Sequence, residues 1–474
     1  MSTRLIVLPQ NGDTQFVPLA VLGYCLTRTQ FLAPLEGVRV CKKALQHQPH
    51  EKLRDILVSI LANCSSVYQS DLRIRPDLVL AEAWGREQFA QQSTLADTLD
   101  AFTANSIAQL RQATQTLLRQ HGHTPRHNFA ETLRLDVDLT GLPASRHAQG
   151  SEKGYFSQRK NTYGRQVVRV SAPAYHETLL SLLYPGSQSG LKTLKNTIHT
   201  TQALLNLTCE QRRQTILRTD AGLGTDDNIN WALSHGYQVL MKGYSGKRAQ
   251  AFARRIPSSA WHDLRADRAV AIVPNAPRYA RRTQTLLVRW TNQSPPPQYA
   301  TLVHSLLDQD WRTIPELFDG RGAMESEIKA DKYGLLMPKR RKKHLAAQEA
   351  LILLTDLAHN LLAWSQDWMF SDSRFRAFGP HALVNDVLCI PGQAIFKGHQ
   401  LHMVALRETH PYAAEMVVCL TKLLAHFVTR EFRAKFSMGL FGECGNFARK
   451  LSLTLIPCPM HHHASQGTPH ENAK

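Results

Sequence analysis

The sequence predicts an α/β protein built around a mixed β-sheet, preceded by a helical region and followed by a mostly helical one. Three observations support this prediction. Before residue 130 the apolar residues have helical spacing, from residue 133 short apolar and β-branched runs are divided by turn residues, and after residue 190 helices alternate with strands. Three consecutive strands followed by this alternation form a mixed sheet with helices on both faces.

Residues 1–130 are predicted to be helical. In the segment 51–64, apolar residues recur with helical spacing at Leu53, Ile56, Leu57, Ile60 and Leu61. The segment 91–120 repeats the pattern, with Ser93 or Thr94 as the candidate cap and a break at residues 103–105. Two helices joined by a turn have a shape that enters a DNA major groove, and an ordinary helical bundle explains the pattern equally well.

The predicted sheet begins with three strands and continues with alternating elements. The strands are 133–142, 165–174 and 177–186, followed by a helix at 191–207, a strand at 214–222, a helix at 226–236 and a strand at 237–244. Asp226 and Asp227 are the predicted caps of the second helix, and Gly236 is its stop. This order of elements is that of a ribonuclease H-like fold.

The segment 246–317 interrupts the alternation and is predicted to be a β-rich insertion. It is rich in Arg and Pro and contains three short apolar runs, at 268–274, 283–291 and 298–306. Beyond it we predict a helix that carries Glu325, a long buried helix at 346–364 and a further helix at 416–436.

The polar tail from about residue 460 is expected to be disordered, and His461–His463 within it is interpreted as incidental rather than as a metal site.

Composition narrows the class of protein. Among 474 residues, 56 Lys and Arg outnumber 38 Asp and Glu, which gives a net charge of +18 and favours a polyanionic partner. A hydrophobic content of 43% indicates a folded interior, and no apolar run approaches the ~20 residues of a membrane helix. The eight Cys show no CxxC pair, so we expect reduced thiols, no zinc site and a cytoplasmic protein.

Three acidic residues stand in settings typical of metal-dependent chemistry. Asp138 projects from the first strand, where Asp136 shares its face, and the Asp-x-Thr pattern formed with Thr140 favours Asp138. Asp220 ends a strand, and Gly222 and Gly224 leave room for a phosphate or metal. Two Asp and one Glu brought together can hold two divalent cations.

The third acidic residue, Glu325, carries the most specific signature. On its predicted helix, Arg321 and Lys332 share its face, where they can hold a phosphate against a metal. Phe318, Arg321, Glu325 and Lys332 have the spacing of the Tyr-x2-Arg-x3-Glu-x6-Lys signature of DDE transposases of the bacterial insertion-sequence type, with Phe in place of Tyr. Residues 131–365 resemble the catalytic core of that family, and Asp138 and Asp220 match its two Asp contexts.

The resemblance implies a cut-and-paste transposase. Its catalytic, metal-binding triad would be Asp138, Asp220 and Glu325, and its cofactor two Mg²⁺ ions, for which Mn²⁺ may substitute. Its partner would be double-stranded DNA with terminal inverted repeats, bound by a homodimer. The implied domains are a DNA-binding region at 1–130, a catalytic core at 131–245 and 318–370, the insertion at 246–317 and a helical region at 371–474.

Several other residues are candidate DNA contacts. Relatives in this subgroup use an inserted β domain to shape a hairpin and stack a flipped base, which makes Trp290, beside Arg289, a candidate for the stacking ring. The alternative places Trp290 in the core of a small sheet. A backbone-binding surface is predicted for Arg254, Arg255, Arg278, Arg281, Arg282 and for Lys339, Arg340, Arg341, Lys342 and Lys343, with a solvated basic face as the alternative.

Three other functions stay open from the sequence. The first is a catalytically inactive DNA-binding protein derived from a transposase, against which the intact Asp138, Asp220 and Glu325 argue. The second is a ribonuclease H-like nuclease or resolvase without joining activity. The third is an RNA-binding structural protein, which rests on charge alone.

Overall fold

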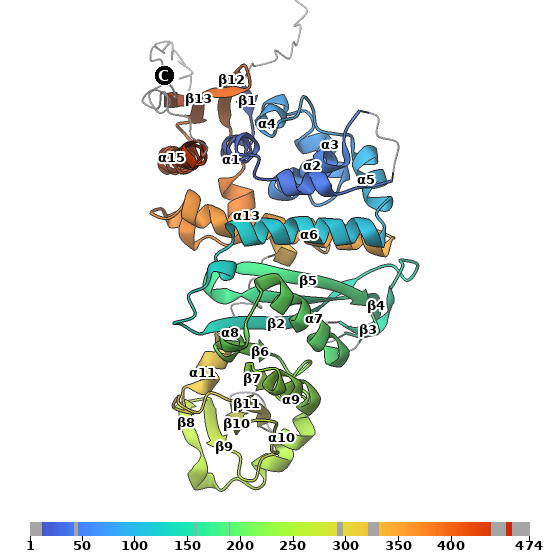
Figure 1. Cartoon of the computed structure of the whole chain (residues 1–474), viewed down its shortest axis with the longest axis vertical. Helices are drawn as coiled ribbons and strands as arrows, with labels where there is room; N and C mark the ends of the chain where they lie inside the picture. The colour runs from blue at the N-terminus through green and yellow to red at the C-terminus, as the bar shows by residue number, and fades with distance from the viewer. Residues whose placement is uncertain are drawn as a thin grey trace, which may run out of the picture.

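The structure is a computed structural model that describes residues 12–41, 46–156, 159–188, 190–291, 297–320, 331–437 and 452–456. The molecule is elongated, with the N-terminal helices and a small sheet at one end and the large sheet running to the other (Figure 1). Helices α6 and α13 lie across the middle, between these two parts. Arg321 and Glu325 lie outside the described residues.

The N-terminal region is helical, as its apolar spacing predicted. Its elements are β1 (Asp13–Thr14), α1 (Val17–Arg28), α2 (Pro49–Leu61), α3 (Tyr68–Arg73), α4 (Leu78–Ala83), α5 (Gln92–Asp100) and α6 (Ala104–His121). The predicted break between the last two helices is confirmed, because Thr103 caps α6 by accepting a hydrogen bond from the Ser106 backbone N–H. Helix α5 begins after Gln91, so neither Ser93 nor Thr94 is its cap.

The large sheet has ten strands. They are β2 (Leu133–Pro143), β3 (Glu152–Phe156), β4 (Arg159–Ala172), β5 (Glu177–Pro185), β6 (Thr215–Thr219), β7 (Gln238–Lys242), β8 (His262–Arg265), β9 (Arg268–Ile272), β10 (Gln284–Trp290) and β11 (Gln298–His304). The order is β3-β4-β2-β6-β7-β11-β10-β9-β8, with β5 paired to β4. Strands β2, β6 and β7 are parallel, and the remaining pairs are antiparallel, so the predicted mixed sheet is confirmed.

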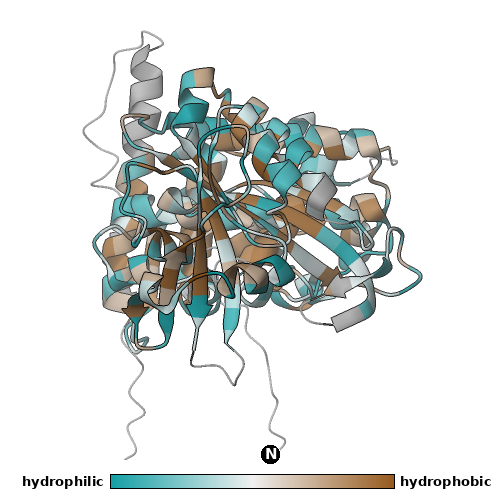
Figure 2. Ribbon diagram, turned by 90° about the horizontal axis from the view of Figure 1, so that it is seen from below, coloured by the Kyte–Doolittle hydropathy of each residue, from teal (hydrophilic) through white to brown (hydrophobic). Residues whose placement is uncertain are grey.

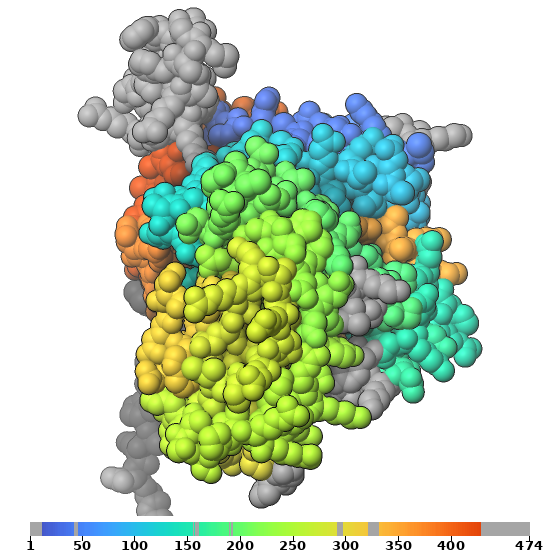
Figure 3. Space-filling model, turned by 60° about the horizontal axis from the view of Figure 1, so that its bottom comes forward, coloured from blue at the N-terminus to red at the C-terminus, as the bar shows by residue number. Residues whose placement is uncertain are grey.

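The segment 246–317 contains the three predicted strands, and they extend the core sheet. Strand β11 pairs antiparallel with β7, aligning Val303 with Met241, and β10, β9 and β8 follow outward. Helix α10 (Gly246–Ala253) packs on this extension, and α11 (Ile314–Asp319) returns the chain to the core. In Figure 3 this part of the chain, drawn in yellow and yellow-green, forms one continuous surface.

Helices cover both faces of the sheet. On one face, α7 (Gly190–Leu205) begins where Gly190 approaches Leu139, and it packs against α9 (Asp226–Ser234). On the other face, Leu142 and Val167 of the sheet pack with Ile352 of α13 (Leu345–Trp368). The strands are mainly hydrophobic where they run through the interior (Figure 2), which places the core between these helices and the sheet.

A second sheet joins the two ends of the chain. Strand β1 pairs with β12 (Gly392–Lys397), which pairs with β13 (Gln400–Arg407), and β14 (Ser452–Ile456) lies parallel to β13. Helix α15 (Ala413–Ser437) confirms the helix predicted there. The strands of this sheet were not predicted, and β1 pairs with a strand more than 370 residues away in the sequence, Asp13 with Gln393.

One predicted cap is wrong. Helix α9 is capped by Thr225, whose hydroxyl accepts a hydrogen bond from the Asn228 backbone N–H, and Asp226 and Asp227 occupy its first turn. Asp226 instead accepts two hydrogen bonds from Arg248 and one from the Tyr279 hydroxyl, which lowers its pKa.

Among the described residues, no helix combines the length and apolarity required to cross a lipid bilayer.

The side chain of Asn360 provides a test of how α13 is held on the sheet. Its amide accepts from the Thr178 backbone N–H at 2.9 Å and donates to the Thr178 carbonyl at 2.8 Å, and all these groups are buried. Asn360→Leu should lower the free energy of unfolding by about 1–3 kcal/mol for each group left unsatisfied, which urea denaturation measures. The exposed-site control Val418→Ala should change it by less than about 0.5 kcal/mol.

Candidate active site

Asp138 and Asp220 occupy equivalent positions on two neighbouring parallel strands. The pairing of β2 with β6 aligns Leu133 with Thr215 and continues without a shift to Val137 and Thr219. One residue further, the same register aligns Asp138 with Asp220 at the point where β6 ends. Open α/β sheets place their functional groups at this edge. The predicted acidic pair is therefore brought together by the sheet itself.

The structure distinguishes Asp138 from Asp136, which shares its face. Asp136 is fully buried, and its two oxygens accept hydrogen bonds from Arg218 Nε and Nη2 at 2.6 and 2.7 Å. Arg218 also donates to the Leu317 carbonyl at 2.7 Å and so attaches α11 to the sheet. Asp138 is only half-buried. Asp136 is thus a structural ion-pair partner, and Asp138 is the candidate ligand of this strand.

Asp220 lies in a tight turn that leaves its carboxylate open to a ligand. Its carbonyl accepts from the backbone N–H groups of Leu223 and Gly224 at 3.3 and 3.1 Å. A Cβ at Gly224 would lie 1.9 Å from the Lys242 carbonyl, so only glycine fits there, and one at Gly222 would lie 3.2 Å from Asp220 Oδ1. That oxygen is buried and has no hydrogen-bond partner. A buried carboxylate oxygen without a hydrogen-bond donor costs free energy, which a bound cation or a donor would offset.

Lys332 lies against strand β2 near Asp138, whereas the helix face that it was predicted to share with Glu325 lies outside the described residues. Its ammonium donates to the hydroxyl of Thr140, two residues beyond Asp138 on β2. Burial lowers the pKa of Lys332, while the nearby Asp138 carboxylate raises it and offsets part of that effect. An ammonium in this position can meet a phosphate that approaches Asp138.

The two ends of the segment that contains Glu325 both lie against this face. At one end, Phe318 packs against the cluster that contains Ile216 and Leu302, and a Cβ at Gly320 would lie 3.3 Å from Arg218 Nη1. At the other end is Lys332 with its bond to Thr140. Arg321 and Glu325 belong to residues 321–330, which the structure does not describe.

The donor set fits a hard divalent cation. Carboxylate oxygens are the ligands that Mg²⁺ and Mn²⁺ prefer, and the unpartnered oxygen of Asp220 is such a donor. Within the described residues, no group of three or more His, Cys, Asp and Glu side chains is arranged to hold a metal. Asp138 and Asp220 are therefore two candidate ligands, and the predicted third, Glu325, lies outside the described residues.

The basic run 339–343 is in part structural, which corrects one predicted DNA contact. Arg340 is 3% exposed and donates to the carbonyls of Cys64 and Leu335, so its side chain is unavailable to a ligand. Lys342 donates to the Ala96 carbonyl at 3.2 Å and pairs with Asp100 at 2.7 Å, which ties this run to α5. Lys339, Arg341 and Lys343 are exposed.

The remaining candidate contacts lie on or near the extension of the sheet. Arg254, Arg255, Arg278, Arg281 and Arg282 are exposed, although Arg281 also donates to the Tyr237 carbonyl. Trp290 is half-buried at the end of β10, where the Arg268 guanidinium lies 5.3 Å and the Lys242 ammonium 5.9 Å from its ring centre. Arg289 lies over Trp261 at 4.5 Å. Trp290 thus packs on the sheet and keeps part of its surface in a basic setting.

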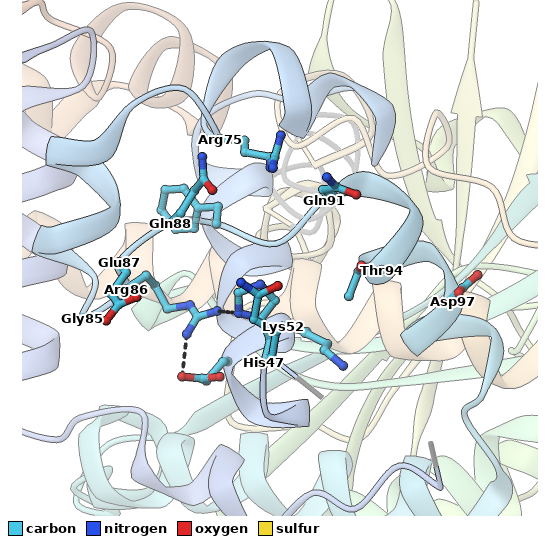
Figure 4. A pocket seen from close by; sticks show the side chains of 13 residues that line it. His47, Lys52, Arg75, Gly85, Arg86, Glu87, Gln88, Gln91, Thr94 and Asp97 are labelled. Atoms are coloured by element: carbon cyan, nitrogen blue, oxygen red, sulfur yellow. Dashed lines mark hydrogen bonds and ion pairs between the residues drawn. The ribbon is translucent and has the colours of Figure 1, made fainter. Parts of the chain in front are cut away.

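A large cavity lies in the N-terminal region, away from the acidic pair. It has a volume of about 800 Å³ and is lined by polar side chains from α2, α5 and the loop before α5 (Figure 4). Arg86, which projects into it, pairs with Glu51 at 2.5 Å, with Asp55 at 3.1 Å and with His47 at 2.7 Å. Arg86 is therefore held in this cavity by three neighbouring side chains.

Sequence reasoning missed the residues that support the acidic pair. Arg169 faces Asp138 across the β2–β4 pairing and is buried with Asp331, Asp356 and His359. A signal was present, since an Arg amid the apolar strand residues 167–172 is unusual unless its charge is paired inside the protein.

The chain is similar to a family of transposases and to a solved transposase structure. The family model described as Transposase DDE domain group 1 matches residues 31–427. Among solved structures, the piggyBac transposase synaptic complex with hairpin DNA is 11% identical over 92% of this chain and 89% of that chain, with a TM-score of 0.46. No curated protein matches.

Arg340 and its neighbour Arg341 form a matched pair for testing the structural role of this run. Arg340→Ala removes charged hydrogen bonds to two carbonyls, and a bond of this kind contributes about 1.5–3 kcal/mol, so the free energy of unfolding should fall by at least that amount. The exposed Arg341→Ala should leave it within about 0.5 kcal/mol of the unaltered protein. Equal stability of both variants, measured by thermal unfolding, would contradict the buried position of Arg340.

Proposed function

Because its family match extends over most of the chain, the protein belongs to the DDE transposases of domain group 1, and we propose that it cuts and rejoins DNA at the ends of its own insertion element. The observation that carries this proposal is that β2 and β6 pair in parallel as far as Val137 and Thr219, the residues that immediately precede Asp138 and Asp220, and that one oxygen of Asp220 is unpartnered. The substrate would be double-stranded DNA with terminal inverted repeats. A homodimer would bring two such ends together.

The chemistry assigned to this site is phosphodiester cleavage followed by strand transfer. Asp138, Asp220 and Glu325 would hold two divalent cations, Mg²⁺ or Mn²⁺, which supply Lewis-acid activation of the attacking and departing oxygens. Lys332 and Arg321 would bind the phosphate beside the carboxylates, where Lys332 is already directed by its bond to Thr140. Arg218, held by Asp136 and by the Leu317 carbonyl, would keep α11 and β6 in fixed positions around Asp220.

DNA outside the reacting phosphate would lie along exposed basic side chains. The candidates are Arg254, Arg255, Arg278, Arg281, Arg282, Lys339, Arg341 and Lys343, all of them exposed. The net charge of +18 supports a polyanionic partner. Trp290, with Arg268 and Lys242 against its ring, is the candidate platform for an unstacked base.

The acidic pair is tested by asparagine variants. Asp138→Asn and Asp220→Asn should each reduce cleavage of a labelled terminal-repeat DNA in Mg²⁺ by at least about 10³-fold, because each removes a carboxylate ligand of the metals. Affinity for the same DNA should stay within about threefold. The control is Asp227→Asn, since Asp227 is 77% exposed and pairs only with Lys195 in the described structure.

The outcomes separate transposase from its nearest alternatives. Retained cleavage in both variants would eliminate the proposed site. Binding of the terminal repeat without cleavage by the unaltered protein, in Mg²⁺ and in Mn²⁺, would identify an inactive DNA-binding descendant. Cleavage without joining to a target DNA would identify a nuclease or resolvase.

The basic surface is tested by the salt dependence of binding. Replacing both Arg254 and Arg255 with Ala should reduce the slope of log affinity against log salt concentration by about two, since each neutralised phosphate contributes about 0.9. Replacing the exposed Arg376, which follows α13 in the chain and lies outside the segment 246–317, should leave the slope unchanged. Identical slopes for the double variant and the unaltered protein would remove α10 from the DNA-binding surface.

A further inference from the structure

Four charged side chains are buried together beneath the acidic pair. They are Arg169 on β4, Asp331 next to Lys332, and Asp356 and His359 on α13, with exposures of 2%, 0%, 7% and 4%. Such burial is a weak source of stability, because the cost of removing charges from water offsets most of their attraction. A cluster of this kind therefore calls for a role other than stability alone.

Arg169 connects the cluster to the strand that carries Asp138. The β2–β4 register places Arg169 directly opposite Asp138, and residues so aligned project from the same face. Its guanidinium donates to Asp331 from one nitrogen, to Asp356 Oδ1 at 2.6 Å from another and to Ser181 Oγ at 3.2 Å from the third. All three donor nitrogens are thus engaged, which fixes the side chain.

His359 holds Asp331 from a second direction. Its Nδ1 lies 2.7 Å from Asp331 Oδ1 and its Nε2 lies 2.9 Å from the His176 carbonyl oxygen. Both ring nitrogens face oxygen acceptors, so both donate only when the imidazole is cationic. The cluster then contains two cations and two carboxylates, and its charges balance.

The two carboxylates of the cluster are not equivalent. Burial raises the pKa of Asp331, but His359 and Arg169 together lower it by more, and the net pKa is lowered. Burial dominates for Asp356, whose pKa is raised despite Arg169. Asp331 receives charged partners on both oxygens, whereas Asp356 receives one from Arg169.

Asp331 stands at a critical point in the chain. It immediately follows the segment that contains Glu325 and immediately precedes Lys332, whose ammonium bonds to Thr140 near Asp138. The Asp331 carbonyl also accepts from the Met337 backbone N–H at 3.3 Å, closing the turn that follows. The position of the chain at residue 331 is therefore set by Arg169 and His359.

We propose that Asp331 is a positioning residue for the active site. Through its bonds to Arg169 and His359 it holds the chain at residue 331 and so keeps the Lys332 ammonium beside Asp138. This inference rests on the proposed transposase function. It assigns to Asp331 the task of keeping the phosphate-binding ammonium in place beside the carboxylates of the sheet.

The test compares Asp331→Asn with Asp356→Asn. Each removes one buried carboxylate charge that pairs with Arg169, but only Asp331 adjoins the Glu325 segment, so Asp356→Asn is the matched control. Asp331→Asn should lower the rate of cleavage at saturating DNA by about 10²-fold, a loss typical of a misplacement near 1 Å, and raise the Mg²⁺ concentration for half-maximal rate. DNA affinity should be unchanged, and Asp356→Asn should retain the rate within about threefold.

A second measurement does not depend on activity. Hydrogen exchange of the backbone amides at 331–337 should become faster in Asp331→Asn and stay close to the unaltered protein in Asp356→Asn. Equal exchange in both variants, or equal losses of rate that follow their losses of thermal stability, would overturn the positioning role. If the unaltered protein does not cleave DNA, the proposed function fails, and the exchange comparison still decides whether Asp331 anchors this segment.

Discussion

The burial of α13 is the constraint on which the rest of the structure depends. This helix of 24 residues packs against β5 on one side and against α2, α5 and α6 on the other, so no side of it faces water for most of its length. Every polar side chain that it carries inward must find a partner inside the protein. Asn360 satisfies the backbone of Thr178, Trp364 donates to Glu177 at 2.8 Å, and Asp356 and His359 enter the charged cluster.

The same helix links the N-terminal region to the sheet. Glu177, fully buried on β5, accepts from the backbone of His123 and Thr124 at the end of the N-terminal region and from Trp364 of α13. Arg340 and Lys342 make the second connection, to the end of α2 and to α5. In these contacts, charged side chains connect helices to the sheet. For this reason part of the basic run 339–343, which suggests DNA binding in the sequence, lies inside the protein.

The helices, strands and motifs that depend on residues close together in the sequence were predicted from local patterns. Apolar periodicity, turn residues or short motifs mark the strands from β4 to β11 except β8, and also the helices α7 and α13. Short motifs also mark Asp138 within β2 and Asp220 just after β6. The features that depend on contacts between residues far apart in the sequence were not predicted. Nothing local shows that β11 pairs with β7, that β1 pairs with β12, or that Arg340 is buried while Arg341 is exposed. The choice of Asp138 over Asp136 rested on a motif, and its physical reason is the guanidinium of Arg218.

Arg218 and Arg169 explain how one face of a sheet can carry both a scaffold and a reactive pair. Each buried arginine neutralises the carboxylates that serve structure, Asp136 in one case and Asp331 with Asp356 in the other. An acidic residue on this face that has no such arginine keeps its capacity for a ligand, and Asp220, with one oxygen unpartnered, is in that position. The placement of the arginines thus determines which carboxylates on this face are engaged in buried ion pairs.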